Sequence, residues 1–181
     1  MTLATWLAVV TICILGAMSP GPSLALVLKQ TLTGGRRNGV ITALAHGIGV
    51  GIYAFLSILG LAAIITASPT AFSVLQWGGA LYLAWLGVKG LMAKRQPDDE
   101  MPEPPTTKSA ARDGFLIAFF NPKIAVFFLA LFSQVVGTET SLLAKFGYAA
   151  TALVIDTSWY LIVAWLFSNP KWLTLLRQKA V

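Results

Sequence analysis

The chain has 181 residues, of which 56% are hydrophobic and only 11% are charged, and its mean hydropathy is +0.75. This balance excludes an ordinary soluble domain and predicts an integral membrane protein. The net charge of +6 does not indicate nucleic-acid binding, because nearly every basic residue lies in a short connection between apolar runs, where basic residues set the orientation of a membrane protein.

Five apolar runs are each long enough to cross a bilayer whose apolar core is about 30 Å thick. The first has no basic residue before it and is longer than a signal peptide, so it is interpreted as a retained span. The sequence therefore predicts an all-α, polytopic helical bundle of five spans. These spans lie at residues 3–28, 40–67, 70–93, 114–136 and 142–168.

Proline interrupts the first and the fourth runs. Ser19–Pro22 reads Ser-Pro-Gly-Pro, and Asn121–Lys123 reads Asn-Pro-Lys. Carbonyl groups freed by a proline cannot face lipid unpaired, so they must face protein or a polar cavity. Broken helices at corresponding positions of two halves indicate the central site of a transporter.

A proline-rich, acidic stretch at 96–112 is predicted to be a flexible cytoplasmic loop that divides the chain. Before it lies a first half of three spans (1–95). After it come a second half of two spans (113–168) and a short basic tail (169–181).

Basic residues alternate between connections, which predicts the orientation of the bundle. They place the connections after the first and third spans, and the tail, in the cytoplasm, and the N-terminus outside. The two proline-broken spans then run in opposite directions, as in an inverted repeat. The basic residues of the two cytoplasmic connections are Lys29, Arg36, Arg37, Lys94, Arg95, Lys108 and Arg112.

Lys123 and Asp156 lie well inside apolar runs, where a charge costs about 2.5–3.5 kcal/mol on insertion scales. Two interpretations remain open: a functional pair in which Asp156 carries a proton, or a structural pair whose charges neutralise each other. His46, the one histidine, is placed near the cytoplasmic end of its span. It is interpreted either as proton-linked or as a satisfied polar residue.

Small residues recur every four positions in the second span, at Gly39, Ala43, Gly47 and Gly51. Such a stripe predicts close helix packing, with a sliding surface as the alternative. Cys13 has no partner cysteine and is interpreted as a packing residue. No metal or other cofactor is expected.

Four segments resemble the lysine exporter/homoserine-threonine resistance (LysE/RhtB) family of amino-acid efflux proteins. They are Ser19–Pro22, Thr33–Gly39, Gly78–Gly87 and Asn121–Phe128. The resemblance implies an inner-membrane exporter of amino acids or close derivatives, threonine- or homoserine-like or otherwise neutral, driven by the proton-motive force. Its partners would be the amino acid, protons and the lipid bilayer.

In this interpretation the helix starts made by the two breaks bind the substrate's carboxylate, with help from Lys123, and Asp156 binds its ammonium group. Protonation of Asp156, and of His46 if it is proton-linked, would release the substrate. The residues expected to bind the substrate are Ser19, Pro20, Gly21, Pro22, Ser23, Asn121, Pro122, Lys123 and Asp156.

The family also has a sixth span, and residues 170–181 are too short to form one. Either a partner chain, such as a second copy in a homodimer, fills the gap, or the protein is a shortened, non-transporting paralogue or membrane scaffold. A remoter alternative is an intramembrane hydrolase using Ser23 and His46. It is disfavoured because no acid completes the set and His46 is placed at the wrong membrane edge, so no enzyme is predicted.

Overall fold

The structure, a computed structural model, describes residues 2–68, 70–71, 73–74, 77–78, 81, 88 and 106–169. The regular elements of these residues are helices, which confirms the all-α class. The predicted span at 70–93 and loop at 96–112 lie largely outside the described residues, as does the tail beyond 169. The helices are α1 (Leu3–Met18), α2 (Pro22–Ala67), α4 (Thr107–Phe120), α5 (Pro122–Val135) and α6 (Leu142–Phe167).

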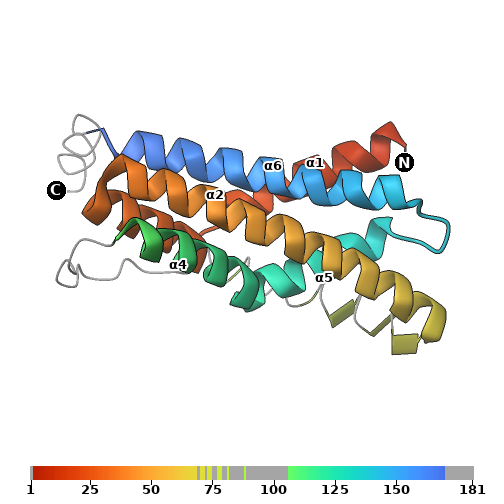
Figure 1. Cartoon of the computed structure of the whole chain (residues 1–181). Coiled ribbons are helices and arrows are strands. Elements are labelled where there is room, and N and C mark those ends of the chain that lie inside the picture. The colour runs from red at the N-terminus through yellow and green to blue at the C-terminus, as the bar shows by residue number, and fades with distance from the viewer. Residues whose placement is uncertain are drawn as a thin grey trace.

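Helix α2 consists of two sections that meet at Gly35. This residue has φ 74° and ψ 178°, a left-handed conformation that glycine adopts without a steric penalty. The first section (22–34) runs to one end of the bundle, and the second section (36–67) returns beside it (Figure 1). The second section of α2 therefore begins before residue 40, where the second span was predicted to start.

Both predicted helix breaks are confirmed. α1 ends at Met18 and α2 begins at Pro22, a position where proline loses no helical hydrogen bond. α4 and α5 meet at Asn121 with a bend of 51°. α1 with the first section of α2, and α4 with α5, run in opposite directions through the bundle (Figure 1), as an inverted repeat requires.

The bundle has two distinct ends (Figure 1). We call one the Gly35 end: it holds the α2 turn, the start of α4 and the end of α6. We call the other the N-terminal end: it holds Thr2, the end of α2 and the connection 136–141 between α5 and α6.

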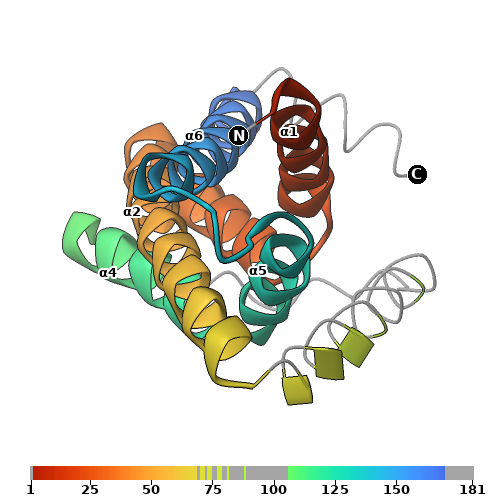
Figure 2. The ribbon, with the colours of Figure 1, turned by 90° about the vertical axis from the view of Figure 1, so that its right-hand side faces the viewer.

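Within the described residues, two helices are long and apolar enough to cross a membrane, α2 over Pro22–Leu61 and α6. The bent pair α4–α5 makes a third when counted as one broken span. Viewed along the bundle, α1, α2, α5 and α6 surround a common centre, and α4 lies outside α2 (Figure 2).

The glycine stripe of α2 lets α6 approach closely. A Cβ atom on Gly47 would collide with the Thr157 side chain, and one on Gly51 would lie 2.6 Å from Leu153 Cδ1. Gly39 lies against Thr31 of the first section. These contacts support the packing interpretation of the stripe.

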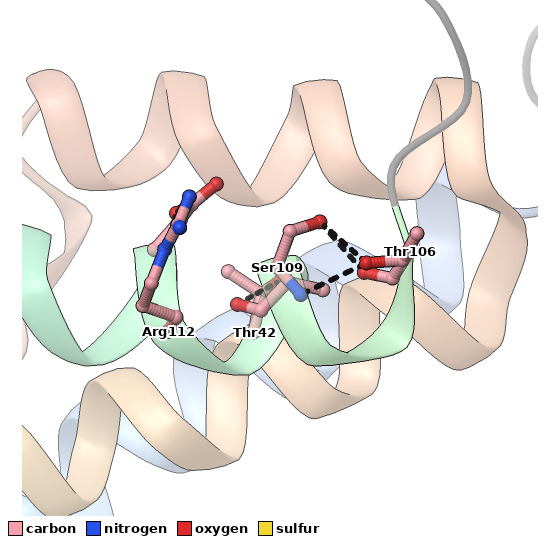
Figure 3. Close-up of polar contacts among 6 residues, drawn as sticks. Thr42, Thr106, Ser109 and Arg112 are labelled. Carbon is pink, nitrogen blue, oxygen red and sulfur yellow. Dashed lines mark hydrogen bonds and ion pairs between the residues drawn. The ribbon is translucent and has the colours of Figure 1, made fainter.

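The start of α4 corrects one predicted boundary, since residues 107–112 are helical rather than part of a loop. Thr106 caps this helix: its Oγ1 accepts a hydrogen bond from the Ser109 N–H at 3.2 Å (Figure 3). Thr107 Oγ1 donates to Asn38 Oδ1 of α2 at 3.3 Å. Thr42 Oγ1, which donates to the Asn38 carbonyl at 2.8 Å, lies 3.3 Å from the Ala110 carbonyl. A threonine cap and these interhelical contacts thus extend the helix beyond its apolar run.

Candidate functional site

The two helix breaks meet at the side chain of Lys123. Its Nζ donates hydrogen bonds to the Ser19 carbonyl at 2.9 Å, to Ser19 Oγ at 2.8 Å and to the Pro20 carbonyl at 3.0 Å. An ammonium group has three hydrogens, so these contacts use all of them. Lys123 therefore supplies the donors that the break removes from the end of α1, where the helix dipole also favours a cation.

Asn121 caps α5 and contacts α2. Its Oδ1 accepts from the Lys123 N–H at 3.0 Å, and its Nδ2 donates to Ser23 Oγ at 3.3 Å. Its backbone carbonyl accepts from the N–H groups of Ile124 and Ala125. The start of α5 is therefore already satisfied by its own cap, and the predicted carboxylate site there is not open in this structure.

The start of α2 differs from that of α5. Pro22 has no N–H, and the Ala25 N–H donates to the Gly21 carbonyl at 3.1 Å. No acceptor for the N–H groups of Ser23 and Leu24 is found within the part of the chain that the structure describes. These two donors lie at the positive end of the helix dipole.

Asp156, His46 and Ser23 form a buried hydrogen-bonded array. His46 Nδ1 lies 2.7 Å from Asp156 Oδ2, and His46 Nε2 lies 2.9 Å from Ser23 Oγ. His46 is fully buried, and the exposed fractions of Ser23 and Asp156 are 5% and 9%. The array links both sections of α2 to α6.

The array corrects three expectations. Lys123 bonds to the first break and Asp156 pairs with His46, so among the described residues the two buried charges do not neutralise each other directly. The expectation that His46 lies apart from Ser23 is wrong, because the two side chains are hydrogen-bonded. The statement that no acid completes the set of Ser23 and His46 is also wrong, because Asp156 takes that position.

A partly open cavity adjoins the array. Val50, one turn beyond His46, and Ala152, one turn before Asp156, extend its lining toward the N-terminal end of the bundle, and Tyr160, one turn after Asp156, lies on the side of the Gly35 end. The residues that line it are Cys13, Gly16, Ala17, Ser19, Gly21, Ser23, His46, Val50, Asn121, Lys123, Ile124, Phe127, Phe128, Ala152, Asp156 and Tyr160.

Seven of the ten residues predicted to bind the substrate or carry a proton therefore line one cavity, and Cys13, predicted as a packing residue, lines it too. Pro20, Pro22 and Pro122 do not line it and act on the backbone, by ending α1 and starting α2 and α5. The sequence analysis missed Tyr160, whose ring packs edge-on against His46 at a centroid distance of 4.9 Å. Its spacing of four residues from Asp156 puts both on one helix face, which was the available signal.

A cavity between broken helices, lined by buried ionisable groups, is the arrangement of a helical membrane transporter. A family model described as LysE type translocator matches residues 14–180, and the chain belongs to this family. The resemblance inferred from the motifs is thus confirmed. The protein is a multi-pass membrane transporter and not an enzyme, although Asp156, His46 and Ser23 stand in the order of a serine-hydrolase triad.

Several bacterial relatives are similar to the chain. A threonine efflux protein of Escherichia coli K12 is 30% identical over 174 residues, which cover 93% of this chain and 84% of the relative. A leucine efflux protein of Klebsiella pneumoniae is 32% identical over 141 residues, covering 76% and 66%. No solved structure matches the chain.

Proposed function

We propose that the protein exports neutral amino acids of the threonine or leucine class across the bacterial inner membrane and that the proton-motive force drives this export. The relatives named as threonine and leucine efflux proteins support the substrate class. The observation that carries the proposal is the buried pair of His46 and Asp156 beside a cavity between two broken helices.

The cavity offers complementary groups for a zwitterion. The N–H groups of Ser23 and Leu24 at the start of α2 would bind the carboxylate. Asp156, whose Oδ2 is taken by His46, would use its other oxygen for the ammonium group. Two charged ends held at fixed positions orient an amino acid without any metal or cofactor.

The remaining wall suits a neutral side chain. Val50, Ile124, Phe127 and Phe128 line the cavity with apolar surface. Lys123, the cation of the lining, has its hydrogens bound to the first break, so it leaves no free donor for an acidic side chain. A second charge on the substrate would have to be buried without a partner, which is costly.

Proton coupling follows from the ionisable pair. Histidine exchanges protons in the physiological pH range, and Asp156 lies in contact with it. A proton entering the pair weakens the attraction of Asp156 for the ammonium group and so favours release. Val50 and Ala152 extend the lining of the cavity from the pair toward the N-terminal end, which the basic residues predict to be outside.

The test uses the full chain purified into proteoliposomes that are loaded with a panel of radiolabelled amino acids. An imposed pH gradient should accelerate efflux of threonine or leucine, and a protonophore should remove the acceleration. Lysine and glutamate should leave no faster than from protein-free liposomes. Failure of every neutral amino acid to leave faster than this control would contradict the proposal and favour a non-transporting paralogue.

A further inference from the structure

The hydrogen-bond directions around Ser23 follow from its partners. An ionised carboxylate only accepts hydrogen bonds, so His46 Nδ1 carries a hydrogen and donates to Asp156 Oδ2. In a neutral imidazole the other nitrogen is then an acceptor. The Ser23 hydroxyl must therefore donate its hydrogen to His46 Nε2, at 2.9 Å.

Asn121 fixes the next direction. Its Oδ1 accepts from the Lys123 N–H, which orients the amide so that Nδ2 points to Ser23 Oγ. A hydroxyl has one hydrogen and two lone pairs. With its hydrogen on His46 and one lone pair on Asn121, Ser23 has one lone pair left, which it can offer to the hydroxyl of Tyr160, its further hydrogen-bond partner, or to a ligand in the cavity that both residues line.

A proton can be added to the His46–Asp156 pair at Asp156 Oδ1, where it occupies the oxygen offered to the ammonium group, or at His46 Nε2, where it reverses the contact at Ser23. In the second case Nε2 carries a hydrogen whether the imidazole stays doubly protonated or passes its Nδ1 hydrogen to Asp156 Oδ2. Nε2 must then donate to Ser23 Oγ and take its remaining lone pair. The hydroxyl hydrogen is released and turns toward the cavity.

We infer that this reversal at Ser23 makes proton binding and amino-acid binding mutually exclusive, an inference that rests on the proposed function. An ammonium group has only donors, so it can bind Ser23 while His46 is neutral and cannot bind it after protonation. Mutual exclusion of two ligands at one site is what exchange of a proton for an amino acid requires. Ser23 is thus the coupling residue between the ionisable pair and the substrate.

The other ionisable groups near His46 do not take over the role proposed for Ser23. On α6 these are Asp156 itself and Tyr160, which presents its ring to the imidazole. On α1 it is Cys13, which lines the cavity, and on α5 it is Lys123, whose ammonium group is bound to the first break. Charge repulsion from a protonated His46 adds to the exclusion but does not depend on Ser23.

Ser23→Ala separates the contribution of the Ser23 contact from that of charge repulsion by protonated His46. Ser23→Thr is the matched variant that keeps a hydroxyl. The measurement is equilibrium binding of radiolabelled threonine, or of whichever amino acid the panel selects, by the purified full chain between about pH 5 and 8. The affinity of the wild-type protein should fall by up to about tenfold per pH unit in the acidic part of this range. Ser23→Ala should flatten this dependence several-fold, and Ser23→Thr should retain it.

A second arm uses the wild-type protein alone, in case Ser23→Ala does not fold. The 2-hydroxy analogue of the amino acid has a hydroxyl in place of the ammonium group, and a hydroxyl can both donate and accept. Its affinity, measured by competition, should not fall on acidification. A wild-type pH dependence in folded Ser23→Ala, or an equal acid weakening of the hydroxy analogue, would overturn the inference and leave the exporter proposal intact. A wild-type protein that binds no amino acid would contradict the proposed function itself.

Discussion

His46 and Asp156 each make the other tolerable inside an apolar bundle. An isolated carboxylate there would be strongly destabilising, and the 2.7 Å contact with His46 Nδ1 supplies a hydrogen bond and allows the pair to share a proton. Under the proposed function the same pair carries the proton, so its structural and proposed roles involve the same contact.

Lys123 makes contacts that the sequence did not predict. Because its three hydrogens bind the first break, we expect Lys123→Met to destabilise the fold by about 1.5–3 kcal/mol, the range for one hydrogen bond to a charged group, or more. Lys123→Arg, which keeps the charge, should recover part of this loss. Thermal unfolding in detergent measures both variants. A Lys123→Met protein that melts like the wild type but no longer binds threonine would instead show that Lys123 binds the carboxylate.

The sequence identified most residues of the site but not their partners. Lys123 and Asp156 stand out because charges are rare in apolar runs, and Ser19–Pro22 stands out because proline breaks helices. The pairing of Asp156 with His46 joins residues 110 positions apart and depends on the packing of α2 against α6. Local patterns contain no information on that contact.

At the scale of helices, small residues set the distance between α2 and α6. Gly47→Ala would drive a Cβ atom into Thr157, one position after Asp156, so it should destabilise the protein by about 1–3 kcal/mol. It should also weaken amino-acid binding by moving His46 away from Asp156.

Gly60 is the matched control for Gly47, because it lies on the same helix and a Cβ atom there meets nothing within 4 Å. Gly60→Ala should be neutral or stabilise the helix by about 0.5–1 kcal/mol. Denaturant or thermal unfolding of both variants checks the pair. Equal effects of the two substitutions would show that Gly47 does not control the helix spacing.

The first break separates α1 from α2, and replacing Pro20 and Pro22 together by Ala should allow one continuous helix. The carbonyls that hold Lys123 and the free N–H groups at the start of α2 would then enter helical hydrogen bonds. We expect the double variant to export nothing, and we expect the gain from a continuous helix to be offset by the loss of the carbonyl acceptors that hold the Lys123 ammonium group. Hydrogen exchange at residues 19–24 and vesicle efflux measure the two effects. Full export by a folded double variant would exclude the break as part of the site.

The helix ends show where the sequence was less informative. Proline identified both breaks, but the start of the second span was placed too late, at residue 40, because residues 36–39 are as polar as a loop. Similarly, Thr106 starts a helix inside the stretch predicted to be a loop. Helix caps and tertiary contacts, such as the one between Thr42 and Ala110, determine these boundaries. The position of an apolar run does not predict such contacts.

At the scale of the molecule, described basic residues gather at the Gly35 end, which predicts that this end is cytoplasmic. In a Cys13→Ser background, a cysteine at Thr138 should react with a membrane-impermeant thiol reagent added outside intact cells. A cysteine at Lys108 should react only after the membrane is opened. The reverse pattern would invert the orientation and with it the direction from which protons reach the cavity.

The central claim is that the His46–Asp156 pair links proton entry to amino-acid exit, and simultaneous measurement of both fluxes tests it most directly. Proteoliposomes are loaded with radiolabelled threonine and a pH-sensitive dye, with equal pH on both sides. For the wild-type protein, the interior should acidify as threonine leaves. Asp156→Asn keeps the shape of the side chain but cannot titrate, so it should abolish the acidification, and it should also weaken threonine binding because the carboxylate binds the ammonium group. Wild-type acidification in Asp156→Asn, or threonine efflux by the wild type without any acidification, would contradict the account.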